Sequence, residues 1–518
     1  MTDSIAEARP PSRLVTWAAI ASAVAVGLAL FGFVRPEWTA LPVGIRFLAG
    51  VVVFGISPGL LVMGPFASRR ERMGAADLLV SILTCSFSCN LIFNIILFQL
   101  HWSMPALTHV YVALQAAGYL AWGIWAWMRH RTNLPAPPAA EDRLPSALVA
   151  WSILLVAAGV VLSYLNYSTG APPTNPEELV WLRKLVDNPA VRYDNLSYRA
   201  GDPSTYLFVP FQIFVAGTSV VAKADIAIVY SLFWGVTTAL SMFVIARLTY
   251  VVFQRIEIAL IAGLWMVVIA LVDPNTVIAT AGIVAPYPNR YGFAGGVLLP
   301  LILLLFWSVL REPRAHFWRW FLLVYVIIEM TFVHARETLL SVGAIATVLL
   351  LLAVRPFFNR THVIRIAVII AVTGAILVGY KRVNLAIAPD LGSYVDEMSQ
   401  ASRGALSQLL AENGPAGVIL APAPNFADVG VGGRTVTLTY GTYQRMFVDT
   451  WGRAYLGRWY LAVALLLLPI VAARAASIAE LSIAATLAGF GLITSSGLLT
   501  LGLSAVVGSP EVLIAYNL

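Results

Sequence analysis

Two adjacent glutamates, Glu177 and Glu178, have the type and position that best fit acid–base chemistry in this chain. They follow Asn175 and Pro176, and this order predicts a helix start. Asparagine can cap the helix, proline fits its first turn, and negative charges are stabilised at this end of the helix dipole. A carboxylate held there can act as a general base that deprotonates an acceptor hydroxyl. The alternative is that both acids only stabilise the helix start.

The helix that follows these glutamates is predicted to be amphipathic. Its apolar face consists of four residues at helical spacing, Leu179, Leu182, Leu185 and Val186. Such a helix is expected to rest on a membrane surface, where a lipid phosphate and a water-side acceptor can meet. On the polar face, we expect Asp187 to pair with Arg183 or Lys184.

Two further segments carry side chains that can bind a substrate. Asp202 lies in a tyrosine-rich loop, and carboxylates with aromatic rings suit sugar binding, although they equally suit an aromatic belt at the membrane interface. Arg290 and Tyr291 stand at the start of an apolar run. An arginine there can bind a phosphate through two parallel hydrogen bonds, or it can serve only as an orientation anchor.

A third polar cluster contains Glu329, His334, Arg336 and Glu337. If one helix continues through it, Glu329, Arg336 and Glu337 share a face. Ionisable groups at the end of a membrane span are costly and usually face a cavity. The cluster is either a self-paired structural group or a pyrophosphate or sugar site, in which His334 and Arg336 neutralise leaving-group charge.

The composition predicts an all-α polytopic membrane protein. Of 518 residues, 59% are hydrophobic and 11% are charged, about half the charge of a typical soluble protein. The net charge of +7 comes from basic residues at the ends of apolar runs, which indicates contact with anionic lipid headgroups rather than nucleic acid. No metal-ligand spacing, phosphate-binding loop or dinucleotide fingerprint is present. The residues assign no cofactor, and the need for a divalent metal stays open.

Apolar runs long enough to cross a bilayer recur along the chain and predict about thirteen transmembrane helices. We place them at 14–34, 43–64, 76–98, 104–128, 146–166, 225–247, 257–273, 292–310, 317–333, 337–354, 364–381, 456–473 and 478–503. The short basic loops after the second and fourth runs should face the cytoplasm. The N-terminus is then cytoplasmic and loop 166–224 is extracytoplasmic.

Four regions follow from this layout. We expect an N-terminal transmembrane module at 1–135, a catalytic transmembrane core at 136–381 that includes loop 166–224, an extracytoplasmic loop at 382–455, and C-terminal spans at 456–518. Within loop 166–224, the short apolar segment 206–221 is expected to lie in the membrane interface, because the later basic clusters then fall inside, except Lys381 and Arg382 at the start of a long loop. Within 382–455, the alternating stretch 434–440 after two glycines is typical of a hairpin arm.

The layout resembles a GT-C-type membrane glycosyltransferase over about residues 43–380. Pro-Glu-Glu-Leu-Val-Trp-Leu-Arg-Lys-Leu (176–185) is similar to the acidic pair and amphipathic helix of that family's first catalytic loop. Gly-Asp-Pro-Ser-Thr-Tyr-Leu-Phe-Val-Pro (201–210) resembles the interfacial helix that follows, and Ala-Arg-Leu-Thr-Tyr-Val-Val-Phe (246–253) resembles the next span. Ser-Pro-Gly-Leu-Leu (57–61) and its basic loop look like a module that precedes some such enzymes.

The resemblance implies a GT-C-like bundle with extracytoplasmic amphipathic loop helices, and a polyprenyl-phosphate sugar as donor. It places Glu177 or Glu178 at the catalytic carboxylate, and it implies a glycan or lipid acceptor in the cell envelope, at a bacterial-type cytoplasmic membrane. The chain departs from the family pattern: glutamates replace the usual aspartate, Asp202 stands before Pro203 where relatives often have histidine, and four extra spans precede the loop.

Two other functions remain open at this point. A transporter or flippase for lipid-linked glycans would use the same charges, but it should carry charges deep in many spans, whereas here they lie mainly at one face. A polysaccharide polymerase or ligase would instead hold its active residues in loop 382–455. Its candidates there are Arg403, Arg434 and Arg445.

Overall fold

The computed structural model describes residues 13–67, 75–131, 176–191, 209–253, 255–272, 290–311 and 317–333, together with 157, 161 and short pieces between 338 and 435. The predicted spans 146–166, 337–354, 364–381, 456–473 and 478–503 lie wholly or largely outside these residues. The chain forms two compact units, Met1–Arg247 with Pro288–Arg290, and Leu248–Tyr287 with Tyr291–Leu518.

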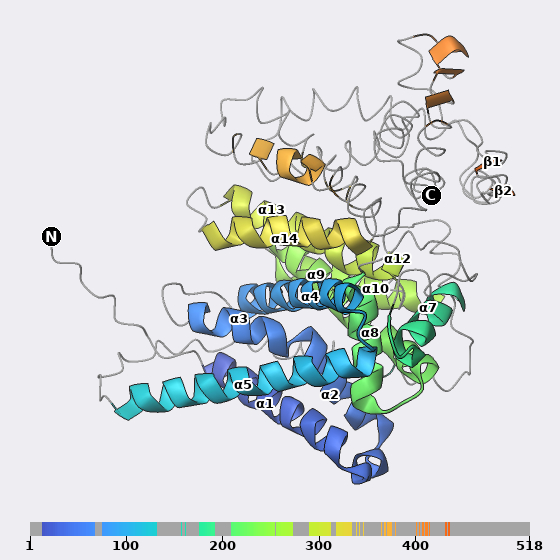
Figure 1. The fold of residues 1–518 in the computed structure, drawn as a ribbon. Coiled ribbons are helices and arrows are strands. Elements are labelled where there is room, and N and C mark those ends of the chain that lie inside the picture. Colours follow the sequence, from blue (N-terminus) through green and yellow to red (C-terminus); the bar gives the residue numbers. More distant parts are fainter. Residues whose placement is uncertain are drawn as a thin grey trace. The chain divides into compact units, whose positions relative to one another are not determined.

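The described part of the first unit is helical (Figure 1). Its elements are α1 (Arg13–Val34), a 3-10 turn η1 (Pro36–Ala40), α2 (Val43–Gly55), α3 (Ser57–Ala67), α4 (Ala75–Leu100), α5 (Met104–Arg131), α7 (Pro176–Asp187), α8 (Pro210–Ala222) and α9 (Ile226–Phe253). Helices that precede and helices that follow residue 135, the predicted boundary, pack together in this unit. Helix α8, which follows it, contacts α1, α2, α4 and α5, which precede it.

Four helices in the described residues are long and apolar enough to cross a membrane, which indicates a membrane protein. They are Val15–Val34, Val43–Gly64, Leu78–Leu100 and Ile226–Phe253, and they coincide with four of the predicted spans. Helix α5 covers the predicted span 104–128 but is not one of the four. Large apolar side chains on α1 and α5 are exposed, as lipid-facing residues are, among them Trp17, Phe31, Leu120 and Trp127.

The second span is broken between α2 and α3. Pro58 has no N–H, so the carbonyl four residues earlier, that of Phe54, loses its helical donor. Asn90 of α4 donates to this carbonyl over 3.0 Å, and Gln115 of α5 donates to the Val53 carbonyl over 3.1 Å. Buried amide side chains thus satisfy the backbone that the break leaves open, as a hydrocarbon environment requires.

Helix α8 lies at the centre of the first unit, and every residue in it except Val220 is buried. Other helices of this unit surround α8, and the expectation that its segment lies in the membrane interface stays a prediction. Glycines allow the close packing: a Cβ on Gly217 would lie 2.1 Å from the Phe54 ring, and one on Gly50 would lie 2.7 Å from the Thr218 methyl. Contacts through small residues of this kind are typical of helices packed in membranes.

The C-terminal end of α8 is held by residues from the start of the chain. Trp38 donates from its indole nitrogen to the Val221 carbonyl over 2.8 Å. Arg46, itself buried, donates from Nη1 to the carbonyls of Ala222 and of Lys223, the latter over 3.1 Å. Lys223 closes the helix in the left-handed conformation, with φ of 46°. The last carbonyls of α8 therefore have donors although the helix end is buried.

The described part of the second unit contains α10 (Ile256–Val272), a π-helical turn η3 (Ala294–Leu298), α13 (Leu299–Arg311) and α14 (Phe317–Val333). The short α12 (Arg290–Phe293) begins with Arg290, which is grouped with the first unit. Helices α13 and α14 pack against each other, and η3 contacts both. Strands β1 (Gly430–Val431) and β2 (Arg434–Thr435) pair antiparallel, so the first residues of the predicted hairpin arm do form a strand, while 436–440 lie outside the described residues.

Candidate functional site

Helix α7 carries the predicted acidic pair and begins at Pro176, the residue that the sequence predicts for its first position. Leu182 and Leu185 are buried, and α7 packs against α8 and α5. The predicted apolar face is therefore real, but in this structure it rests on other helices. Packing against protein fixes the position of the first turn more firmly than a lipid surface would.

Glu178 lies in that first turn and is buried, with 1% of its side chain exposed. Its Oε2 is 3.8 Å from Nε of Arg290, whose side chain is 5% exposed. Both residues were predicted as site residues for separate reasons, Glu178 as a base and Arg290 as a phosphate ligand. The structure brings the two charges together within the first unit.

Trp181 completes this arrangement on α7. It follows Glu178 by three residues, so the two side chains lie on the same side of the helix. The guanidinium carbon of Arg290 is 4.6 Å from the centre of the Trp181 ring. This distance is within the range of a cation–π interaction, which is stronger where water is excluded. Arg290 is thus held by the ring and by the carboxylate of one helix.

The geometry of the Glu178–Arg290 pair differs from that of a tight salt bridge. Charge-assisted N–H···O contacts usually measure about 2.7–2.9 Å, and the 3.8 Å separation here is longer. Taking two charges out of water has a large desolvation cost, which only excellent geometry recovers. A buried and loosely coupled pair adds little to folding, while it places a carboxylate and an anion-binding group side by side.

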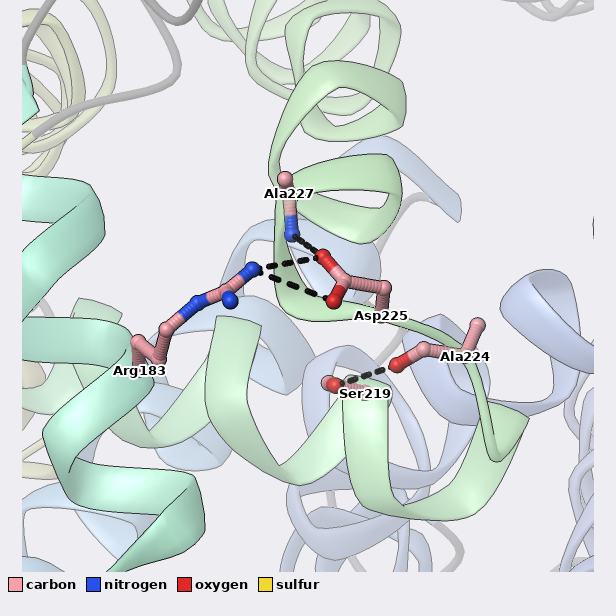
Figure 2. Close-up of polar contacts among 5 residues, drawn as sticks. All are labelled: Arg183, Ser219, Ala224, Asp225 and Ala227. Carbon is pink, nitrogen blue, oxygen red and sulfur yellow. Dashed lines mark hydrogen bonds and ion pairs between the residues drawn. The ribbon is translucent and has the colours of Figure 1, made fainter.

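Arg183 on the opposite side of α7 makes a second charged contact, which Figure 2 shows. Its Nη2 lies 3.1 Å from both carboxylate oxygens of Asp225. Arg183 therefore pairs with Asp225 and not with Asp187, whereas the sequence predicts that Asp187 pairs with either Arg183 or Lys184. Asp225 also accepts the Ala227 N–H over 2.8 Å and caps the start of α9. The contact links α7 to α9 across two half-exposed side chains.

The remaining predicted site residues fall outside what the structure describes. Asp202, His334, Arg336 and Glu337 are not among the described residues, and the side chains of Glu177 and Tyr291 are likewise not described, so their predicted roles stay predictions. Glu329 of the third cluster is described and is fully buried on α14. Among the residues that the structure describes, no group of three or more His, Cys, Asp or Glu side chains is arranged to hold a metal ion.

Sequence reasoning missed two residues of this region. Trp181 carried a signal that could have found it, its spacing of three residues from Glu178 on the same helix. Asp225 also carried one, because an aspartate directly before a long apolar run is a typical helix cap.

Comparisons with known proteins give no further assignment: no protein-family model, no curated protein and no solved structure matches this chain.

Proposed function

We propose that this chain is a membrane glycosyltransferase that moves a sugar from a polyprenyl-phosphate donor to a cell-envelope acceptor. The observation that carries the proposal is the buried Glu178 beside Arg290, with Trp181 against the guanidinium. A carboxylate that is fixed at a helix start and shielded from water suits a general base, and an adjacent arginine suits a phosphate. The site would face the extracytoplasmic side of a bacterial-type cytoplasmic membrane, with the N-terminus in the cytoplasm.

The proposed reaction inverts the sugar. Glu178, or its neighbour Glu177, takes the proton of an acceptor hydroxyl. The acceptor oxygen attacks the anomeric carbon while the bond from that carbon to the phosphate oxygen breaks, and the electron pair leaves with the phosphate. The products are a new glycosidic bond and a free polyprenyl phosphate. Arg290 stabilises the charge that develops on the leaving phosphate.

The test uses the full-length protein in lipid nanodiscs with synthetic undecaprenyl-phosphate hexoses and pentoses and with envelope glycan as acceptor. Mass spectrometry measures the free undecaprenyl phosphate and the extended glycan. Glu178→Gln should lower the rate by roughly 10² to 10⁴, the contribution of a general base. The control is Glu257→Gln, since Glu257 is also in the first turn of an apolar helix and 3.8 Å from an arginine, but is 67% exposed.

The outcomes separate the rival functions. Loss of transfer in Glu177→Gln alone would assign the base to Glu177. Full activity in both single variants and in the double variant would remove the proposed base. Loss only on substitution of Arg403, Arg434 or Arg445 would instead indicate a polymerase or ligase that uses loop 382–455. Movement of lipid-linked glycan across the membrane without any transfer would indicate a transporter.

A further inference from the structure

We infer that Glu178 occupies, in the free protein, the anion position of a phosphate site whose cation is Arg290, and that a bound lipid phosphate displaces the carboxylate. This inference rests on the proposed function and adds to it a coupling between the two substrates. The donor releases the base, so the carboxylate becomes available for the acceptor only after the donor is bound.

The Arg290 side chain is placed to bind an anion. Its guanidinium is buried and lies 4.6 Å above the Trp181 ring, so its orientation does not depend on Glu178 alone. A guanidinium presents a planar set of N–H donors that matches a carboxylate and a phosphate equally well in shape. A phosphate offers more acceptor oxygens and more negative charge than the carboxylate, so it competes for the same donors.

The contact between Glu178 and Arg290 is longer than a close charge-assisted hydrogen bond, with 3.8 Å between Oε2 and Nε. Because the pair is buried, a closer opposite charge would stabilise each group more than it would in water. Replacement of the carboxylate by a phosphate at Arg290 is therefore favourable in a site where water does not compensate.

Glu178 remains in a favourable position for a negative charge after displacement. It lies in the first turn of α7, where the helix dipole and the first backbone N–H groups stabilise a negative charge. In the proposed displacement, a rotation about its side-chain bonds moves the carboxylate away from Arg290 while α7 stays packed against α8 and α5. No covalent bond changes in this step. The released carboxylate keeps its charge and can accept a proton from an acceptor hydroxyl.

The test is a binding measurement in nanodiscs with undecaprenyl phosphate, and with undecaprenol as the probe that lacks the phosphate. Glu178→Gln should bind undecaprenyl phosphate about tenfold more tightly than the native protein, because a like charge next to the anion has been removed. Arg290→Gln should lose this binding. Neither substitution should alter binding of undecaprenol, and Glu257→Gln should leave both affinities unchanged.

A merely structural ion pair would give the opposite result. Glu178→Gln would then leave Arg290 less well held, and the binding of undecaprenyl phosphate would weaken. Equal or weaker binding by Glu178→Gln overturns the inference.

If this variant does not fold, Glu178→Asp decides, since its shorter side chain draws the charge away from Arg290. Binding tighter than native supports displacement, and unchanged binding overturns it. Loss of transfer together with unchanged binding would overturn the displacement but not the proposed base. Tighter binding together with full transfer would support the phosphate site and overturn the role of Glu178 as the base.

Discussion

The side-chain amide of Asn90 donates a hydrogen bond over 3.0 Å to the carbonyl of Phe54, the carbonyl that Pro58 leaves without a helical donor. The Oδ1 atom of the same amide accepts the Tyr111 hydroxyl over 3.0 Å. Asn90 is fully buried. A break in one helix is thus matched by an amide in another, and the two features should depend on each other.

Asn90→Leu should lower the free energy of unfolding by about 1–3 kcal/mol, the cost of leaving buried polar groups without partners. Pro58→Ala restores an N–H at that position, so the loss caused by Asn90→Leu should be smaller in the Pro58→Ala background. Thermal unfolding of the four proteins in detergent gives the coupling between the sites. Equal losses in both backgrounds would show that Asn90 does not compensate for the proline.

Glycine substitutions test the close approach of the helices. A Cβ on Gly59 would lie 1.8 Å from the Ile82 carbonyl oxygen, a backbone atom that cannot move aside, so Gly59→Ala should abolish the folded protein. Gly217→Ala meets the buried Phe54 ring and should destabilise strongly. Gly123→Ala meets no atom within 4 Å and should be neutral or slightly stabilising, as expected for alanine in a helix. Yield of monodisperse protein on size exclusion and its melting temperature are the measurements.

Arg46→Gln removes the buried donors at the end of α8. We expect a loss of about 2–4 kcal/mol, because the carbonyls of Ala222 and Lys223 lose charged donors inside the protein. Arg255→Gln is the control, since that arginine is 69% exposed and its ion pair with Glu257 should contribute little. Denaturant-induced unfolding compares the two variants, and similar small losses would contradict the capping role of Arg46.

Two substitutions at Asp225 separate its two roles. Asp225→Asn keeps an oxygen for the Ala227 N–H and should cost only a few tenths of a kcal/mol, whereas Asp225→Ala removes the cap and should cost about 1 kcal/mol. The Arg183–Asp225 pair is about half exposed, so a double-mutant cycle with Arg183→Gln should give a coupling below about 1 kcal/mol. A coupling of several kcal/mol would mean that this contact organises α7 more than its exposure suggests.

The sequence was sufficient for features that depend on neighbouring residues. The start of α7 at Pro176 and four of the membrane spans follow from local helix signals and from the length of apolar runs. Glu178 and Arg290 are also predicted as site residues separately, each from the charged side chain and its place in its own segment. Their contact could not be predicted, because spacing within a segment carries no information on which distant segment it meets.

The burial of α8 within the protein follows from the composition of its own sequence. The segment 210–222 is apolar almost all round, and its polar side chains are Gln212, Thr218 and Ser219. A helix that is apolar on all sides is buried. The positions of the later basic clusters predict on which side of the membrane the segment lies, but they carry no information on which helices surround it.

The capping of α8 by Trp38 and Arg46 has a consequence for biosynthesis. A ribosome synthesises α1 to α5 before α8, so the residues that cap α8 are already present in the nascent chain when this helix is made. A shortened gene that begins after codon 135 would keep α7 and α9 but lose α1, α2, α4 and α5, and the last carbonyls of α8 would lose the donors that Trp38 and Arg46 supply. We therefore expect α8 to be capped and packed only in a chain that retains these leading helices.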